Sequence, residues 1–348
     1  MLGRVQPAWA RLSAIARLLV LALLIVSCGG SAPAPTAVSA SPAGTASAAP
    51  SRVALKVNWT ALTGANSGLW TAYEAGYFRD EALDVELVNI NSSSRSIAAL
   101  IAKEVQIAAA DVGNLVDVVV GGGNVKAINS VTNRLIFSVM GQPGIAKVAD
   151  LKGKKIGITT PGSSTHTAGL EALRLAGLKE SDVTFVSLTE VPNILAALSA
   201  KQIDAGVVSP PTNTRARASG FTEVINLATD GPDFPSVCFA ATGEYIAANP
   251  DVIKRFVKAY SRGVVRFRSD KTFGMNAINK YLKLDDKAVL EDTWTQFSKY
   301  IEVPPYVKGL DVVIASRGDK AKAVTAAQIF DDRFVKQLES EGYFKDLK

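Results

Sequence analysis

The sequence has few of the residues that build metal centres and disulfide frameworks. Its 348 residues include two cysteines and a single histidine, and they contain no C-x-x-C pair. Two cysteines exclude a disulfide-rich scaffold, and one histidine argues against a histidine-based zinc site. A G-x-x-x-x-G-K-[ST] loop, which would bind the phosphates of ATP, is also absent. We therefore expect no metal, no cofactor and no ATP site on this chain.

Long basic runs are absent too. The formal net charge is +6, but Arg4, Arg11 and Arg17 lie in the first 27 residues, which hold no acidic residue. Without these three arginines, 35 basic residues face 32 acidic ones, which leaves a net charge of +3. The basicity therefore belongs mostly to the N-terminus, and we expect no nucleic-acid partner.

The N-terminus has the pattern of an export signal. A basic leader precedes the apolar run 18–26 (LLVLALLIV), which is much shorter than the ~20 residues of a membrane-spanning helix. The run ends in Ser27-Cys28-Gly29 and resembles the bacterial lipoprotein signal, in which a small residue precedes the cysteine to be lipidated. The resemblance implies that Cys28 is acylated and becomes the new N-terminus. The alternative is a stray cysteine at the end of an ordinary signal peptide.

The segment after this cysteine lacks the large side chains that a core requires. Residues 29–51 are Ala, Ser, Pro, Thr and Gly with one valine, and none is charged. We interpret residues 1–27 as a signal peptide and residues 28–52 as the lipidated cysteine with a flexible tether. The folded part then lies outside the cytoplasm, in the periplasm or at the cell surface, anchored to a membrane by lipid. Cys238 has no partner in the mature chain, so we expect it to be a small buried residue.

The folded part alternates between strand and helix patterns. Its composition, 48% hydrophobic and 20% charged in the whole chain, suits a globular protein with two core-sized domains. Alternation of this kind predicts an α/β fold in which mostly parallel sheets are flanked by helices. Two similar cycles are visible, and a segment of long amphipathic helices follows. The predicted strands are 53–59, 83–90, 105–110, 155–159, 183–187 and 203–208, and the clearest helices are 69–78, 193–200, 251–267, 270–281 and 288–300.

Several segments carry a resemblance to a known family. Residues 69–78 (LWTAYEAGYF) with 83–87 (LDVEL) resemble an A-x-E-x-G-Y-F…G-L-D-V-E opening, 150–157 (DLKGKKIG) resemble D-L-K-G-K-x-I-G, and 249–256 (NPDVIKRF) resemble N-P-x-x-I-x-x-F. In this order, they are similar to the type II periplasmic substrate-binding proteins of the nitrate/sulfonate/taurine branch, which includes thiamine-pyrimidine-synthase-like members. The resemblance covers nearly all of residues 53–348.

This resemblance implies two lobes joined by two crossover segments, with a ligand bound between them. We place lobe I in residues 53–140 and 241–348 and lobe II in residues 141–240. The crossovers are expected near residues 131–141 and 236–244. The terminal helices must pack on one of the lobes, so that lobe is discontinuous.

Two clusters of hydroxyl residues are candidates for the ligand site. In open α/β sheets, ligands bind beyond the carboxyl ends of strands, where loops meet helix N-termini. Such helix starts suit an anionic group, whereas plain N-capping would need only one hydroxyl per helix. The two clusters occupy equivalent places in the two cycles, which favours a site. They consist of Ser92, Ser93 and Ser94, and of Ser163, Ser164 and Thr165.

Six other candidate residues lie at the ends of predicted strands or in the segments that follow them. Trp59 could stack on a planar ligand or pack in the core. Arg95 could pair with an anion or remain solvated, and Asp111 could contact a ligand or cap the next helix. His166 could contact a polar ligand by resemblance, or lie exposed at a helix start. Ser209 and Pro210 follow the last strand of the second cycle, where sulfonate and taurine binders carry other residues, which weakens the transfer of their specificity.

The expected function is that of a solute-binding protein for an ABC importer. It would capture a small organic ligand, with a sulfonate or carboxylate expected first and a neutral pyrimidine second. The permease and ATPase would be separate chains, and we expect a monomer. The alternatives are a pyrimidine-synthase-like enzyme, a thiamine-precursor binder, or a tethered ligand sensor. The enzyme would by resemblance need a CCCFC-type segment, which is absent, so we expect no catalytic residue.

Overall fold

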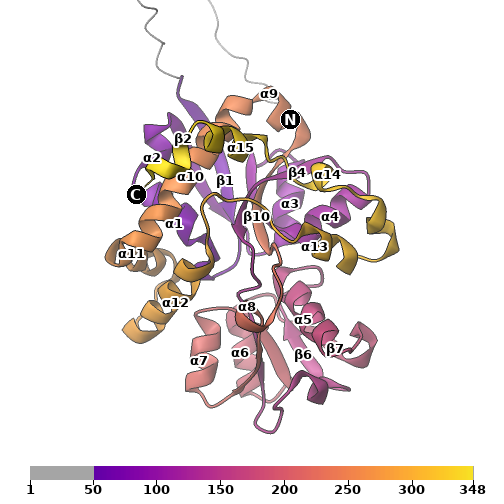
Figure 1. Cartoon of the computed structure of the whole chain (residues 1–348). Helices are drawn as coiled ribbons and strands as arrows, with labels where there is room; N and C mark the ends of the chain where they lie inside the picture. The colour runs from indigo at the N-terminus through magenta and orange to yellow at the C-terminus, as the bar shows by residue number, and fades with distance from the viewer. Residues whose placement is uncertain (1–50, 348) are drawn as a thin grey trace, which may run out of the picture. The chain divides into compact units, whose positions relative to one another are not determined.

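A computed structural model describes residues 51–347, which form two α/β lobes, each built on a five-stranded sheet (Figure 1). The predicted signal peptide, the lipidation site Cys28 and nearly all of the predicted tether lie outside these residues. Within the described range, no helix is both long and apolar enough to cross a membrane.

The first sheet has the strand order β2-β1-β3-β10-β4. Strands β1, β2 and β3 pair in parallel, whereas β10 pairs antiparallel with both β3 and β4. Four strands therefore run one way and β10 runs against them, which confirms the prediction of a mostly parallel sheet. The strands are β1 (Val53–Trp59), β2 (Leu83–Asn89), β3 (Ile107–Asp111), β4 (Val125–Thr132) and β10 (Val237–Thr242).

The second sheet repeats this pattern in the order β7-β6-β8-β5-β9. Here β6 pairs in parallel with β7 and β8, and β5 is the strand that runs against its two neighbours. In each lobe, the reversed strand is thus the first strand after the chain has crossed from the other lobe. The strands are β5 (Ser138–Gly141), β6 (Lys155–Ile158), β7 (Thr184–Ser187), β8 (Ala205–Val208) and β9 (Thr222–Asn226).

The two crossings lie slightly before the predicted boundaries. The chain leaves the first sheet after Thr132 and enters the second at Ser138, and it returns between Asp230 and Val237. The predicted limits after residues 140 and 240 therefore fall inside β5 and β10, so the second crossover prediction, 236–244, needs correction to residues 231–236. Both β5 and β10 are buried and apolar, and sequence patterning alone does not show on which side of a hinge such a strand lies.

Helices cover both faces of each sheet. The first lobe carries α1 (Ser67–Glu74), α2 (Tyr77–Asp80), α3 (Ser93–Ile101), α4 (Val112–Val120) and α9 (Gly243–Ala248), and the second carries α5 (Ser164–Leu175), α6 (Val191–Ser199), α7 (Thr212–Ala218) and α8 (Leu227–Asp230). The sequence predicted one helix over 69–78. In the structure, Gly76 adopts a φ of 78° and separates α1 from α2, because a left-handed residue ends an α-helix and glycine adopts that conformation without strain.

The C-terminal segment returns to the first lobe. Helix α10 (Pro250–Ser269) packs along α1, and a Cβ added at Gly263 would lie 2.4 Å from the carbonyl oxygen of Gly68. This close approach requires glycine, since any larger residue would push the two helices apart. The remaining helices are α11 (Lys271–Leu282), α12 (Lys287–Tyr300), α13 (Leu310–Ser316), α14 (Ala326–Ile329), α15 (Arg333–Ser340) and α16 (Tyr343–Asp346). The prediction of three long helices in this segment is confirmed by α10, α11 and α12.

The hydrophobic core continues through the crossings. One cluster joins the first sheet to α1 and α10, with Phe239, Phe256 and Tyr260 in edge-on and stacked contact. A second cluster runs from the opposite face of that sheet into the second lobe, and it includes the crossing residues Leu135 and Phe137. The crossings are therefore packed segments, so the two lobes are held at a defined hinge.

Candidate functional site

A cleft lies between the two lobes, where loops from both sheets meet. It encloses about 770 Å³ of space free of protein atoms, part of it open to solvent. Its walls come from loops after β1, β2, β6, β7 and β8, together with both crossings. The lining residues are Thr60, Ala61, Leu62, Thr63, Ala65, Asn91, Ser92, Ser93, Thr132, Ile136, Phe137, Thr159, Ser163, Ser164, Thr165, Thr189, Glu190, Val191, Ser209, Ser236, Val237 and Phe297.

The start of α3 forms one wall of this cleft. Ser92 is the N-cap residue, and its hydroxyl makes no capping hydrogen bond to any described residue. The Ser93 hydroxyl accepts a hydrogen bond of 2.7 Å from the backbone N–H of Asp111, which ties α3 to the end of β3. Ser94 and Arg95, by contrast, are exposed and do not line the cleft. The helix start therefore presents Ser92 and its first N–H groups to the cleft.

The start of α5 forms the facing wall. Ser163 and Thr165 share a hydroxyl cluster with Thr159, whose Oγ1 lies 2.8 Å from the Ser163 oxygen and 2.9 Å from the Thr165 oxygen. These bonds hold the turn between β6 and α5 in shape. Ser164 also lines the cleft and takes no part in this cluster. Ser163 and Thr165 therefore shape the turn, whereas Ser164 lines the cleft and its hydroxyl lies near enough to the buried Asp111 carboxylate to act against the rise of its pKa.

Asp111 lies behind the cleft wall and is completely buried. Its Oδ1 accepts the backbone N–H of Gly113 at 2.9 Å, so the carboxylate caps α4. Burial raises its pKa from 3.8 to about 6, although the nearby charge of Arg317 acts in the opposite direction. Arg317 lies 3.4 Å from Asp111 and donates a 2.9 Å hydrogen bond to Thr167 of α5. The pair thus contacts both lobes.

Trp59 and His166 also lie outside the residues that line the cleft. Trp59 packs edge-on against Trp70, with ring centroids 5.2 Å apart, and belongs to the aromatic core of the first lobe. The Nδ1 of His166 accepts the backbone N–H of Gly162 at 3.0 Å, while its Nε2 lies 3.4 Å from Glu180. Burial lowers the pKa of this histidine. Both side chains therefore make contacts within the protein, and neither faces the cleft.

Ser209 and Pro210 directly follow β8. Ser209 is 2% exposed, lines the cleft, and has a hydroxyl that meets no hydrogen-bond partner among the described residues. Pro210 is buried beside it without lining the cleft. A buried hydroxyl without a partner costs free energy, about 1–3 kcal/mol, so Ser209 is available to a ligand atom.

Charge is scarce in this cleft. Glu190 is the one ionisable side chain among its lining residues, and Asn91 from the opposite lobe donates a hydrogen bond of 2.8 Å to it. Neither residue is among the site residues predicted from the sequence. Asn91 precedes the first serine cluster, and Glu190 follows the strand pattern 183–187, so the rule that sites lie beyond strand ends would have found both. Elsewhere in the range 51–347, no cluster of His, Cys, Asp and Glu could hold a metal ion.

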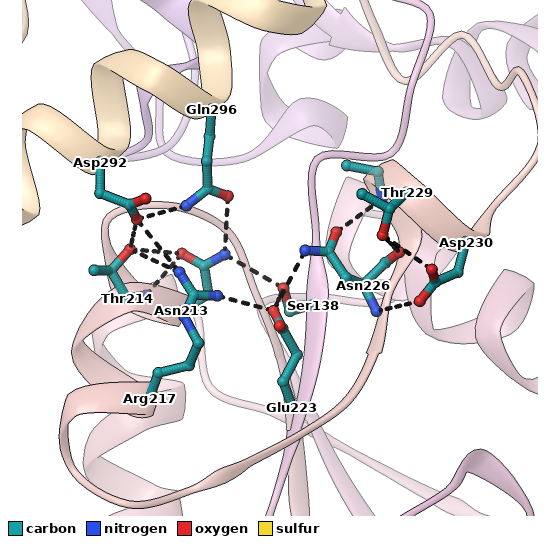
Figure 2. Close-up of polar contacts among 11 residues, drawn as sticks. Ser138, Asn213, Thr214, Arg217, Glu223, Asn226, Thr229, Asp230, Asp292 and Gln296 are labelled. Carbon is teal, nitrogen blue, oxygen red and sulfur yellow. Dashed lines mark hydrogen bonds and ion pairs between the residues drawn. The ribbon is translucent and has the colours of Figure 1, made fainter.

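A second polar contact joins the lobes away from the cleft. Figure 2 shows α12 of the first lobe facing α7 of the second. Asp292 accepts hydrogen bonds from Thr214 and from Arg217 (3.3 Å), and Asn213 donates to Gln296 at 3.3 Å. Arg217 also pairs with Glu223 at 2.9 Å, which fixes the guanidinium. Side chains of the two lobes therefore meet both among the residues that line the cleft and outside them.

Two lobes of this topology, with a cleft between them and two chain crossings, define the fold of periplasmic binding proteins. The chain resembles the alkanesulfonate-binding protein SsuA from Xanthomonas axonopodis pv. citri, solved with bound MOPS, with a TM-score of 0.65, 19% identity, and coverage of 85% of this chain and 96% of that one. The chain belongs to the NMT1/THI5-like family, whose model matches residues 65–269.

Curated relatives agree with this assignment. A protein of Brucella abortus named as a binding protein is 31% identical over 226 residues, which is 63% of this chain and 68% of the relative. A protein of Escherichia coli K12 named as an aliphatic sulfonates-binding protein is 31% identical over 215 residues, or 62% of each chain. The resemblance noted in the sequence is thereby confirmed at the level of family and fold.

Proposed function

We propose that this chain is the solute-binding subunit of an ABC importer rather than an enzyme. The observation that carries the proposal is the cleft between the lobes, lined by hydroxyl groups and by the starts of α3 and α5. The names of the relatives support a binding role. A permease and an ATPase, on separate chains, would complete the importer.

The ligand we propose is a small organic molecule with a sulfonate or carboxylate group. No lysine or arginine is among the described residues that line the cleft. The positive potential must therefore come from the first N–H groups of α3 and α5, each a helix of at least nine residues. Helix starts bind anions because their N–H groups are unpaired and the peptide dipoles align. Apolar walls from Ile136, Phe137 and Phe297 would contact the organic part of the ligand.

Capture requires the lobes to move. The two crossings, residues 133–137 and 231–236, connect the sheets and provide the hinge for opening and closing. A ligand that contacts Ser92 in one lobe and Ser164 in the other favours the closed arrangement, because only that arrangement offers both contacts. We further propose that the protein is a monomer outside the cytoplasm, anchored to a membrane through lipid on Cys28.

The proposal is tested by removing one hydroxyl from each helix start. In a panel of organic sulfonates and carboxylates, at least one should raise the melting temperature of the wild-type chain. The double variant Ser92→Ala, Ser164→Ala should bind that compound roughly 10-fold more weakly, about 1.4 kcal/mol. Ser94→Ala, which alters an exposed serine beside the cleft, is the matched control and should bind like wild type. Unchanged affinity in the double variant would place the site elsewhere.

A further inference from the structure

We propose that Arg317 is a positioning residue of the cleft, which holds the wall formed by α5 of the second lobe against the first lobe through Thr167. The arginine is placed by residues 303–317, a segment that we call the strap. The inference rests on the hinge motion of the proposed function, because it names a contact that decides how readily the lobes close. Neither Arg317 nor Thr167 lines the cleft, so the contact acts whichever solute is bound.

The strap is bonded to the first crossing and packed against the second. Asn133 of the first crossing donates a 2.9 Å hydrogen bond from Nδ2 to the carbonyl oxygen of Tyr306, and its Oδ1 accepts the backbone N–H of Lys308 at 3.0 Å. A Cβ added at Gly309 would lie 2.6 Å from the carbonyl oxygen of Asp233, in the second crossing. The strap therefore contacts both of the connections on which the lobes turn.

At the end of the strap, contacts within the first lobe orient the Arg317 side chain. A Cβ added at Gly113 of α4 would lie 1.6 Å from a guanidinium nitrogen, so the arginine packs against bare backbone and any larger residue would exclude it. The Arg317 side chain is 10% exposed, and it forms ion pairs with Asp111 at 3.4 Å and with Asp117 at 3.5 Å. The guanidinium is therefore fixed in one place on the first lobe.

Thr167 connects this fixed guanidinium to the second lobe. Nη2 of Arg317 donates a 2.9 Å hydrogen bond to the Thr167 hydroxyl, which is buried. Thr167 lies in the first turn of α5, and its backbone N–H donates to the carbonyl oxygen of Ser163 at 2.9 Å. The same turn carries Ser164, which lines the cleft. A hydrogen bond from a charged donor is stronger than a neutral one, so Arg317 holds this turn close to the first lobe.

The bond is made or broken as the lobes move. Asp111 and Asp117 belong to the first lobe, as Arg317 does, whereas Thr167 belongs to the second. Opening that moves α5 away from α4 breaks the hydrogen bond and leaves both ion pairs intact. A contact that exists only when the lobes approach each other favours the closed arrangement.

The experiment measures the distance between α3 and α5 in the full-length chain without added solute. Spin labels are attached to a reactive unnatural amino acid incorporated at the exposed positions Ala98 of α3 and Lys179 after α5, which leaves the native cysteines unchanged. Pulsed electron paramagnetic resonance gives the shares of short and long distances. We expect both populations in the wild type, the short one corresponding to the contact of Arg317 with Thr167.

Variants of the two partners assign the short population to this bond. Thr167→Val removes the accepting oxygen at nearly constant volume and should lower the ratio of short to long distances roughly 5-fold. Thr167→Ser keeps the hydroxyl, is the matched control, and should stay within about 2-fold of the wild type. Circular dichroism should show that both variants are folded.

Arg317→Lys replaces the guanidinium fork by a single ammonium group and should also lower the ratio. Adding Thr167→Val to this variant should lower the ratio little further, because both substitutions remove the same bond. Arg333→Lys is the control for this pair, because Arg333 pairs with Asp331 of its own lobe. It should leave the ratio as in the wild type.

An unchanged ratio in Thr167→Val would overturn the inference, and so would an equal fall in Thr167→Ser, which would assign the effect to packing. A wild-type chain that shows only long distances would overturn it as well. These results are independent of the sulfonates and carboxylates that test the proposed function. A chain that binds none of them and shows the expected ratios retains the inference and loses the ligand class, and the reverse result retains the ligand class and loses the inference.

Discussion

At the scale of single residues, Asp111 and Arg317 form a buried ion pair behind the cleft wall. Asp111 caps α4 and touches Arg317, which in turn reaches Thr167 in the other lobe. Arg317 is about nine-tenths buried, and its second nitrogen lies 3.5 Å from Asp117. A buried charge is stable only when its partners compensate for the lost hydration. Substitution of any one partner should therefore destabilise this cluster.

The raised pKa of Asp111 predicts a pH dependence of stability. Its pKa is about 6 in the folded chain against an ordinary 3.8, so the folded state binds more protons between these values. Its contribution to the free energy of unfolding therefore falls as pH rises from about 4 to 6 and is constant above. Asp111→Asn keeps a capping oxygen and does not titrate. Relative to this variant, wild type should lose stability over that window, by roughly 3 kcal/mol at most.

Urea unfolding of both proteins at pH 4, 5, 6 and 7 provides the measurement. The two proteins differ by a single titratable group, so the difference between their stabilities reports on Asp111. A flat difference for Asp111→Asn would contradict the raised pKa.

Residue types and strand ends indicated part of the cleft before its geometry was known. Ser92, Ser93, Ser163, Ser164, Thr165 and Ser209 all line it, whereas Trp59, Ser94, Arg95, Asp111, His166 and Pro210 do not. The difference lies in side-chain direction. Ser93 and Ser94 are neighbours on one helix turn, yet one is buried and the other exposed, because successive residues of a helix point about 100° apart. The sequence of a loop or of a helix start does not show in which direction each side chain points.

At the scale of elements, the contact between α12 and α7 bears directly on closure. Asp292 of α12 accepts hydrogen bonds from Thr214 and Arg217 of α7 (Figure 2). The pair of Arg217 and Asp292 is about one-third exposed on each side, so its strength is modest and suits a contact that must break and re-form.

Removing the Asp292 carboxylate should therefore favour the open arrangement. Spin labels placed at the exposed residues Arg215 of α7 and Lys287 of α12 would report the distance between the helices by pulsed electron paramagnetic resonance. In Asp292→Ala we expect a larger share of long distances, by roughly 3- to 5-fold, since exposed pairs contribute up to about 1 kcal/mol.

Glu291→Ala is the matched control for this measurement. Glu291 directly precedes Asp292 on α12, and it pairs with Lys271 of its own lobe. Its removal should leave the distance distribution as in wild type. An unchanged distribution in Asp292→Ala would mean that this contact does not contribute to holding the lobes together.

The elements themselves were largely predictable. Alternating apolar residues identified β2, and apolar periodicity identified α10, α11 and α12. The break between α1 and α2 was missed because Tyr77 and Phe78 continue the apolar pattern past Gly76. Strands β5 and β10 were not among the predicted strands, and the limits between the lobes were displaced as a result, because a fully buried strand has no polar face to show which sheet it joins.

At the scale of the whole molecule, the fold followed from the order of strands and helices together with the family resemblance. The direction of the reversed strands could not be predicted, because parallel and antiparallel buried strands look alike in sequence. The prediction for the N-terminal segment has a different basis from that for the fold. Cys28 lies outside the described residues, and its lipidation rests on the sequence alone.

Lipidation of Cys28 predicts a specific labelling pattern. When the full chain is expressed in a bacterium supplied with labelled palmitate, wild type should incorporate label and partition into membranes. Cys28→Ala should do neither, because the acyl chains have lost their attachment site. Cys238→Ala is the control, because it removes the other cysteine, which is buried, and it should be labelled like wild type. Label retained by Cys28→Ala would exclude this anchor.

The central claim is that one small solute binds between the lobes, and native mass spectrometry tests it most directly. The chain is purified without denaturation and exposed to a metabolite extract of bacterial cells. We expect one solute bound per chain, released when the protein is denatured, and we expect the double variant Ser92→Ala, Ser164→Ala to lose it. A chain that retains no solute, or a solute retained equally by the folded double variant, would contradict capture in this cleft.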